Sequence, residues 1–299
     1  MISCARSDSW VGSPARSSEV RFFLTAATFC SSATAKGTGP VAVKPVTIAG
    51  LAGPNQRYQA YASAQLAGLA QAVARIQADL RRDDRAAAER DWLTAQLDWE
   101  RVGASYNSFG DLGTAVDGLP GGLPGGAGDK NFTGLHRLEY GLWHGQRAAE
   151  LLPVTAALAR DVASVRRGLT SDDLAGDPAN LPVRAHEILE DALRDHLSGA
   201  DDQGAGAAYP MTSADLQVTR VVLGELSGLI NARQPGLLAI IGSQEAVLEK
   251  ALLAARSGAA WLSPAQAPLP TRQAVDAATG QLLETLSSVP DLLEVRPAG

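Results

Sequence analysis

The chain has 299 residues and a formal net charge of -6, with 45% hydrophobic and 19% charged residues. This acidic balance argues against a nucleic-acid binder, which needs a basic surface to displace the counterions of phosphates. Aromatic residues make up only 5% of the chain, which argues against a β-sandwich, and the hydrophobic content is that of a globular protein rather than a disordered one.

The first segment, residues 1–50, differs from the rest of the chain. Its stretch Val20–Cys30 is a weak candidate for a short signal-peptide core that ends at a lipidated cysteine, because Phe29 is bulky for a cleavage site. We favour the alternative, the remnant of a preceding β domain or a mis-assigned start, with short strand pieces at 41–43 and 46–48. Cys4 and Cys30 both lie here, so no disulfide framework is expected in the main body. No apolar run is long enough to predict a transmembrane helix.

From Gly53 onward, apolar residues at helical spacing between glycine and proline breaks predict eight helices. We place them at 55–82, 84–106, 132–147, 153–167, 182–197, 212–233, 235–256 and 271–286, with a glycine-proline linker at 118–126. Eight helices with short connections predict an all-α fold of two antiparallel four-helix bundles. The expected domains are an N-terminal segment over 1–50, a helical double bundle over 51–290 and a C-terminal tail over 291–299.

The helix over 132–147 carries the first candidate metal ligands. His136 and Glu139 are three residues apart, so both side chains can reach one ion from the same face of the helix. Imidazole and carboxylate groups together are a common ligand set for zinc, iron and copper. The alternative for this pair is a hydrogen bond at the surface.

The helix over 182–197 carries a second histidine and carboxylate pair. His186 and Glu190, four residues apart, lie at the edge of the apolar face, and we expect them at an interior site. The alternative is a partly buried hydrogen bond that joins neighbouring helices. The opposite, solvated side is expected to carry Glu187, Asp191, Arg194 and Asp195. His144 and His196 are expected to be surface or packing residues.

Glu100 is the third candidate, because it falls inside a wide apolar arc that includes Trp92 and Trp99. A buried carboxylate is costly without a partner. That partner is either an arginine or histidine from another helix, or a metal ion shared with His136 and Glu139. Three helices would then present acids toward one interior point, and such an oxygen-rich set suits iron while leaving zinc or copper as alternatives.

The segment Asn131–Tyr140 resembles the Gly-x-His-x-x-Glu signature of the imelysin-like family, and more closely its EfeO-type members, components of bacterial EfeUOB iron-uptake systems. The segments 99–101, 108–113 and 184–190 support the resemblance, which covers roughly residues 50–288. It implies a double four-helix bundle with a metal held by His136 and Glu139, and Glu100 as the matching acid. Family members often carry a cupredoxin-like domain before the helices, of which residues 20–48 would be only the tail.

The resemblance also implies a place at the periplasmic or extracellular face of the cytoplasmic membrane, with contact to the membrane at most through a lipid anchor. Its implied partners are an iron permease and a peroxidase-like protein of the same system. The leading hypothesis is therefore a non-enzymatic iron-binding component that hands ferrous or ferric iron to a permease. The alternatives are an imelysin-type metallopeptidase and a metal-free ligand-binding bundle. The sequence lacks His-Glu-x-x-His, the usual zinc site with a built-in general base.

Overall fold

The computed structural model describes residues 44–103, 109–169 and 176–295. Within these ranges the regular structure is helical apart from one two-stranded hairpin and an isolated bridge, which confirms the all-α prediction. The expectations for Cys4, for the stretch Val20–Cys30 and for residues 41–43 lie outside the described residues.

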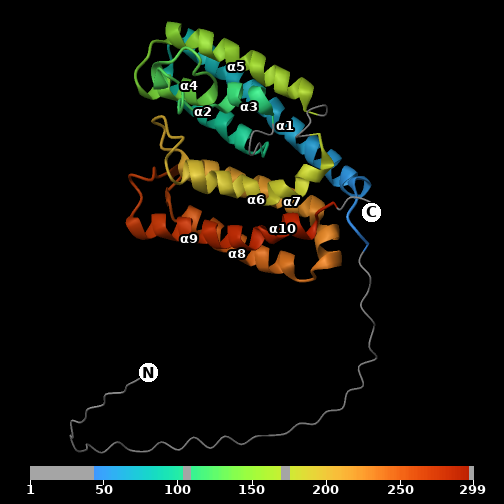
Figure 1. Cartoon of the computed structure of the whole chain (residues 1–299). Helices are drawn as coiled ribbons and strands as arrows, with labels where there is room; N and C mark the ends of the chain where they lie inside the picture. The colour runs from blue at the N-terminus through green and yellow to red at the C-terminus, as the bar shows by residue number, and fades with distance from the viewer. Residues whose placement is uncertain (1–43, 104–108, 170–175, 296–299) are drawn as a thin grey trace, which may run out of the picture. The chain divides into compact units, whose positions relative to one another are not determined.

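The first half of the chain forms one group of helices that pack on each other (Figure 1). The long first helix lies between the second and the fifth, and the third and fourth cover the fifth. A short 3-10 turn at Gly126–Gly128 interrupts the glycine-rich loop before the fourth helix. The helices of this group are α1 (Ile48–Arg81), α2 (Arg85–Glu100), α3 (Gly110–Asp117), α4 (Gly134–Trp143) and α5 (Ala148–Gly168).

The second half forms the other group, in which α6 packs on α7, α7 on α8, and α8 on α9 (Figure 1). The two groups meet where α7 contacts α1 and α2. In the hairpin, Arg256 lies opposite Trp261. The elements are the 3-10 turn Pro178–Asn180, α6 (Leu181–Asp191), the π turn Ala192–His196, α7 (Ala208–Arg233), α8 (Leu237–Leu253), β1 (Arg256–Ser257), β2 (Ala260–Trp261), α9 (Leu269–Leu286) and α10 (Ser288–Leu292).

Several helix boundaries differ from the prediction, for local reasons. Helix α1 begins at Ile48 rather than near 55, because the Thr47 hydroxyl caps it by accepting from the Gly50 backbone amide at 3.1 Å. Helix α2 ends at Glu100 because Gly103 turns the chain with a φ of 69°. Helix α7 begins at Ala208, upstream of the expected cap at 212. The short helix α3 and the hairpin were not predicted.

The most consequential difference is the π turn that follows α6. The Leu197 amide donates to the Ala192 carbonyl at 2.9 Å, five residues back instead of four. A π turn holds more residues than an α turn, so the side chains beyond it are rotated relative to an α-helical wheel. His196, at the end of this turn, is buried.

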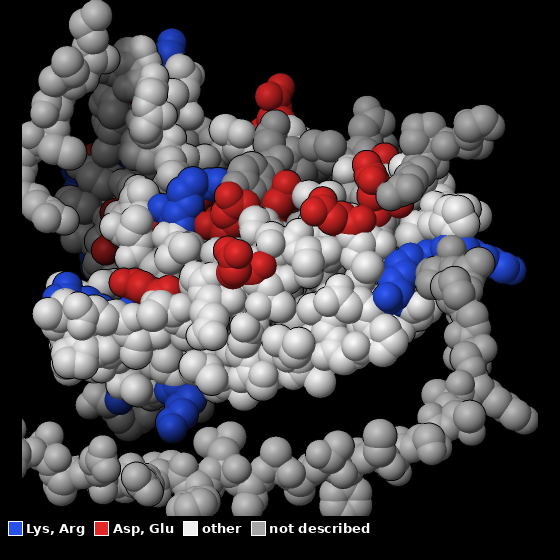
Figure 2. All heavy atoms as spheres, turned by 60° about the horizontal axis from the view of Figure 1, so that its bottom comes forward, with Lys and Arg blue, Asp and Glu red and all other residues white. Residues whose placement is uncertain are grey.

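None of the helices in the described part of the chain combines the length and apolar character needed to cross a bilayer. The face formed by the lower helices of Figure 1 carries few charged side chains (Figure 2). Helices α8 and α9 also hold four of the exposed large apolar residues: Ile240, Val247, Leu253 and Leu269.

Gly134 determines how α4 starts. Its φ is 85°, and a Cβ added there would lie 2.3 Å from the backbone oxygen of Val116 in α3. Only glycine therefore allows the first turn of α4 to approach α3 this closely. The indole nitrogen of Trp92 donates to the Leu135 carbonyl at 2.9 Å and ties the same turn to α2. These contacts fix the position from which His136 projects.

We predict that Gly134→Ala lowers the free energy of unfolding by at least about 2 kcal/mol, because it combines a left-handed backbone conformation with a collision against backbone atoms. Urea unfolding measures the loss. Gly145→Ala is the matched control, since Gly145 has a φ of 73° but nothing within 4 Å of an added Cβ. An equal loss in the two variants would show that contact with α3 is unimportant.

Candidate metal centre

A polar cavity of about 90 Å³ lies between the two groups of helices. Side chains from α2, α3 and α4 reach it from the first group, and side chains from α6, the π turn and α7 reach it from the second. Its ionisable lining consists of Glu100, Asp117, His136, Asp191, Asp195, His196, Asp201 and Asp215. We call this cavity the interbundle pocket.

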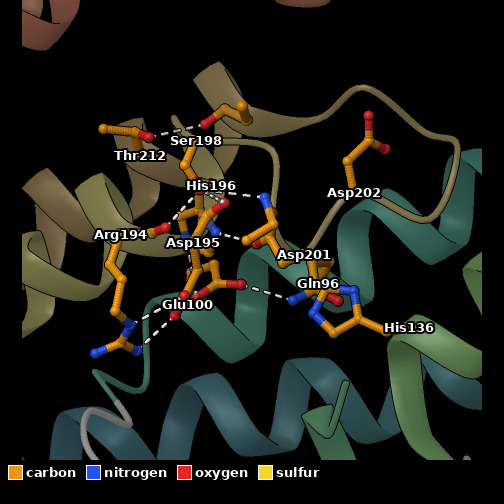
Figure 3. Close-up of polar contacts among 12 residues, drawn as sticks. Gln96, Glu100, His136, Arg194, Asp195, His196, Ser198, Asp201, Asp202 and Thr212 are labelled. Carbon is orange, nitrogen blue, oxygen red and sulfur yellow. Dashed lines mark hydrogen bonds and ion pairs between the residues drawn. The ribbon is translucent and has the colours of Figure 1, made fainter. Parts of the chain in front are cut away.

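His196 is the first of two imidazoles in the pocket. Its Nε2 atom lies 3.1 Å from Asp215 Oδ2 and 3.6 Å from Glu100 Oε2. Its Nδ1 atom forms a hydrogen bond with the carboxylate of Asp201 (Figure 3). An ionised carboxylate can only accept, so this bond places the neutral ring's proton on Nδ1 and leaves the Nε2 lone pair directed at Glu100 and Asp215.

His136 is arranged in the same way from the other side. Its Nδ1 atom lies 3.0 Å from Glu139 Oε2, and its Nε2 atom lies 3.4 Å from Asp117 Oδ1. The other oxygen of Glu139 accepts from the backbone amides of Gln203 at 2.9 Å and Ala205 at 3.0 Å. Glu139 is thus a positioning residue for His136. Asp117 contacts the other ring nitrogen, Nε2, on the side of the ring that faces the pocket.

Gln96 connects the two halves of the pocket. Its side-chain amide donates to Glu100 Oε1 at 2.6 Å (Figure 3) and to Asp117 Oδ1 at 3.0 Å. Gln96 is fully buried, and Glu100 is 8% exposed. This donor holds two carboxylates in fixed orientations where their mutual repulsion would otherwise separate them.

The charge in the pocket shifts its ionisation equilibria. Burial raises the pKa of Asp117 to about 7 and that of Asp215 to about 8, against the lowering effect of the nearby imidazoles. Burial also disfavours protonated His136, but Asp117 and Glu139 outweigh it and raise the pKa of His136 to about 9. The pKa of His196 is raised well above its usual value, because Glu100, Asp201 and Asp215 outweigh the effect of its burial. Protons thus neutralise charge that a bound cation would otherwise neutralise.

Glu100, His196 and Asp215 have the geometry of a metal site. Each offers one ligand atom within 4.8 Å of the other two, and all three residues are buried. Asp215 Oδ2 is buried and contacts His196 Nε2 at 3.1 Å, with no other polar partner among the described residues, so an ion held between these two atoms would satisfy both of them. The triad offers two oxygens and one nitrogen, a donor set that fits divalent iron, manganese or zinc.

The structure places the predicted site residues in three different situations. Glu100 and His136 line the pocket, as expected for ligands. Glu139 is buried but contacts the far nitrogen of His136, so the prediction that it shares an ion with Glu100 does not fit its position. His186 and Glu190 lie 3.3 Å apart, with side chains 25% and 42% exposed, and neither lines the pocket.

The prediction of an interior site for His186 and Glu190 is therefore wrong, because the buried face of α6 is rotated away from them. Arg184 is only 3% exposed; it donates to the Gly103 carbonyl at 2.6 Å and lies over the Tyr58 ring. The face that begins at Arg184 continues through Asp191 to Asp195, which line the pocket and pair with Arg194. Asp191 and Asp195 were expected on the solvated side of the helix, and the structure places both in the pocket lining instead.

Four residues of the pocket were not predicted from the sequence as site residues: His196, Asp117, Asp201 and Asp215. His196 was expected at the surface but is 7% exposed, and the π turn hides its direction from a helical wheel. Asp215 carried a usable signal, since it stands alone among the apolar residues of α7 and is 3% exposed. With the helix start predicted at 212, Asp215 falls in the first turn, where an acidic residue needs no special explanation. Asp111, in the segment 108–113 that supports the family resemblance, is exposed in the first turn of α3.

The chain is similar in sequence to known proteins. The family model described as Imelysin matches residues 54–287 of the chain. Among curated proteins, the chain is similar to the iron uptake system component EfeM of Pseudomonas syringae pv. syringae (strain B728a), with 25% identity over 153 residues. The match covers 51% of this chain and 53% of EfeM, so the chain spans about half the length of that relative.

We predict that Glu139→Gln weakens metal binding by about 10- to 100-fold while the fold persists. The new carbonyl can accept from Gln203 and Ala205, which turns the amide group toward His136 Nδ1 and moves the ring proton to Nε2. Isothermal titration with a divalent metal measures the affinity. Glu190→Gln, on the exposed His186 pair, is the control and should bind like the wild type; equal affinity in both variants would contradict the positioning role.

We further predict that the metal-free protein loses stability as the pH rises from about 5 to about 9. Native Asp117, Asp215 and His136 keep protons that the unfolded chain releases near 3.8 and 6.5, because their folded pKa values are raised. The folded state binds more protons over this range, so the free energy of unfolding falls with pH. Thermal melts in EDTA measure the effect, and the Asp117→Asn, Asp215→Asn double variant should show a shallower decline. A melting temperature that rises over the same range in the wild type would contradict the assignment.

Proposed function

The chain belongs to the imelysin family, and we propose that it is a non-enzymatic iron-binding component of an iron-uptake system. The observation that carries this proposal is the buried triad of Glu100, His196 and Asp215, reached from three elements of two helical groups. A protein that carries a cation needs such a preformed, water-poor site, whose ligands converge before the ion arrives.

The ligand chemistry favours iron as the cargo. Carboxylate oxygen and imidazole nitrogen suit ferrous and ferric iron, whereas cuprous copper prefers thiolate or thioether sulfur. Among the described residues, the pocket lining supplies oxygen and nitrogen donors and no cysteine or methionine. Zinc and manganese can use the same donors, so competition between metals is part of the test below.

The uptake role is supported by the similarity to EfeM, which is named as an iron uptake component. In the proposed role the chain works outside the cytoplasmic membrane and passes iron to a permease, with a peroxidase-like protein of the same system as a further partner. Any lipid anchor would come from the stretch Val20–Cys30, which lies outside the described residues.

The pocket is better suited to binding and carrying a metal ion than to hydrolysing peptides. A metallopeptidase needs a metal with an open position next to a carboxylate free to act as general base. The nearby acids instead contact the imidazoles: Glu139 holds His136, and Asp201 holds His196. A casein or peptide cleavage assay with metal and chelator controls tests this part of the proposal, and metal-dependent cleavage would contradict it.

We predict that His196→Ala weakens ferrous iron binding by at least about tenfold, the scale of effect expected when metal-site residues are lost. Anaerobic calorimetric titration gives the affinity, and elemental analysis of protein purified from its native host gives the metal carried. His186→Ala is the matched control, since it removes an imidazole from the same chain segment but outside the pocket.

The outcomes separate clearly. Loss in His196→Ala with normal binding in His186→Ala supports the pocket as the iron site. Equal loss in both variants would show that the effect is not specific to the pocket and would contradict the assignment of the iron site. Wild-type protein that binds zinc but not iron under competition would remove iron carriage from the proposal.

A further inference from the structure

A second cavity, of about 740 Å³, lies beside the interbundle pocket and shares His196 with it. Its other walls come from the loop 198–206, the start of α7, the segment after β2 and the first turns of α9. We call it the outer cavity, and we propose that it binds the zwitterion of a free α-amino acid with an apolar side chain. This inference goes beyond the proposed function, because the residues that carry it do not belong to the metal centre.

The outer cavity has the size and the fixed walls of a small-molecule site. Its volume lies in the range of about 300–1,000 Å³ that is typical of such sites. On one side, Asp202 Oδ1 accepts from the backbone amides of Gly204 at 2.9 Å and Gly206 at 3.0 Å. On the other, the Ser263 amide donates to Gln266 Oε1 at 2.9 Å. The two segments touch at Gly206, where an added Cβ would lie 2.6 Å from Ser263 Cβ. Walls that are ordered in advance reduce the entropic cost of binding.

Tyr209, in the first turn of α7, supplies the most direct sign of a ligand. It lines the outer cavity but is only 2% exposed. Among the described residues, its hydroxyl has no hydrogen-bond partner. The nearest charges that shift its pKa are Asp276, which raises it, and Arg272, which lowers it. Both line the same cavity, so the hydroxyl faces the cavity. A buried hydroxyl without a partner is costly, and an oxygen of a ligand would satisfy it.

Arg272 and Asp276 supply one charge of each sign next to this hydroxyl. They are four residues apart and therefore lie on the same face of α9. In the part of the chain that the structure describes, neither side chain forms an ion pair or a hydrogen bond. A guanidinium binds a carboxylate through two parallel hydrogen bonds, and a carboxylate accepts from an ammonium group. The pair therefore matches both charged groups of an α-amino acid.

The charge balance disfavours a purely anionic or purely cationic ligand. Besides His196, the ionisable lining comprises Arg272, Asp202 and Asp276. An anion on Arg272 would be repelled by the two aspartates, and a cation on Asp276 would be repelled by the arginine. A zwitterion avoids both conflicts, because it places the opposite charge on each residue of α9.

The rest of the lining favours an apolar side chain on the ligand. Leu269 lines the outer cavity although it is 55% exposed, and a ligand that covers it would remove apolar surface from water. Pro264 and Ala265 add further apolar surface. Trp261 also lines the cavity, and its ring is held under the guanidinium of Arg256 at 5.1 Å. Aromatic rings of this kind pack well on aromatic or aliphatic groups.

The test titrates the metal-free full chain, in EDTA, with L-phenylalanine by isothermal calorimetry. Two analogues separate the charges of the zwitterion, since 3-phenylpropanoate lacks the ammonium group and phenethylamine lacks the carboxylate. We expect L-phenylalanine to bind with a Kd below about 1 mM. Each analogue should bind at least about tenfold more weakly, because it leaves one charged residue of α9 without its partner.

Three variants test the residues themselves. Arg272→Gln and Asp276→Asn should each weaken binding of L-phenylalanine by at least about tenfold, the effect of losing a charge-assisted hydrogen bond. Tyr209→Phe keeps the ring and should weaken binding by about three- to tenfold. Glu284→Gln is the control, since Glu284 is exposed on α9 outside the cavity, and it should bind like the wild type.

No binding of L-phenylalanine or L-leucine by the wild type up to about 10 mM would overturn the proposal. Binding of 3-phenylpropanoate as tight as that of L-phenylalanine would also overturn it, since the cavity would then be an anion site. Unchanged affinity in Arg272→Gln would have the same effect. The titrations contain no metal, so these outcomes leave iron carriage intact, and a failure of iron binding leaves the amino-acid site intact. Circular dichroism checks that the variants fold, and the analogues decide the question on the wild type if a variant does not.

Discussion

The interbundle pocket depends on Glu139, a buried carboxylate that joins the two groups of helices. One oxygen accepts from Gln203 and Ala205 in the loop after the π turn, and the other contacts His136 on α4. The same side chain therefore docks a loop of the second group on a helix of the first and sets the direction of an imidazole. A carboxylate in this role cannot be replaced by a residue that only fills space, because a buried backbone amide without an acceptor is itself costly.

The pocket can hold many acidic residues because the core around it is apolar and stabilises the fold. Trp92, Leu135 and Leu138 are almost completely buried on the helices that carry Glu100 and His136, and the core continues through both groups of helices. That apolar burial supplies most of the stability of a helical protein. The polar centre reduces stability in exchange for specific geometry, which is the usual relation between a functional site and its scaffold. An ion that binds only the folded chain restores part of this loss by mass action.

The sequence predicts the helices well because apolar spacing and glycine or proline breaks are local properties, and it identifies His136, Glu139 and Glu100 as inward-facing for the same reason. It fails for His196 because a π turn changes the angle between residues, and nothing in the local composition of residues 192–196 announces that turn. It gives no signal for the burial of Arg184, because burial of a guanidinium depends on a distant partner, the carbonyl of Gly103. Long-range partners of this kind are invisible to a helical wheel, which describes one helix at a time.

His136 and His196 share one hydrogen-bonding arrangement, which the structure reveals and the sequence does not. Each ring is held at Nδ1 by an acid that follows it in the chain, Glu139 three residues after His136 and Asp201 five residues after His196. The first spacing fits one turn of an α-helix and is recognisable in the sequence, whereas the second runs from the end of the π turn into a loop and is not. Their Nε2 atoms then meet acids on other elements, Asp117 on α3, and Glu100 and Asp215 on α2 and α7. Cations in this pocket would therefore join the two groups of helices, because the ligands of the triad come from both.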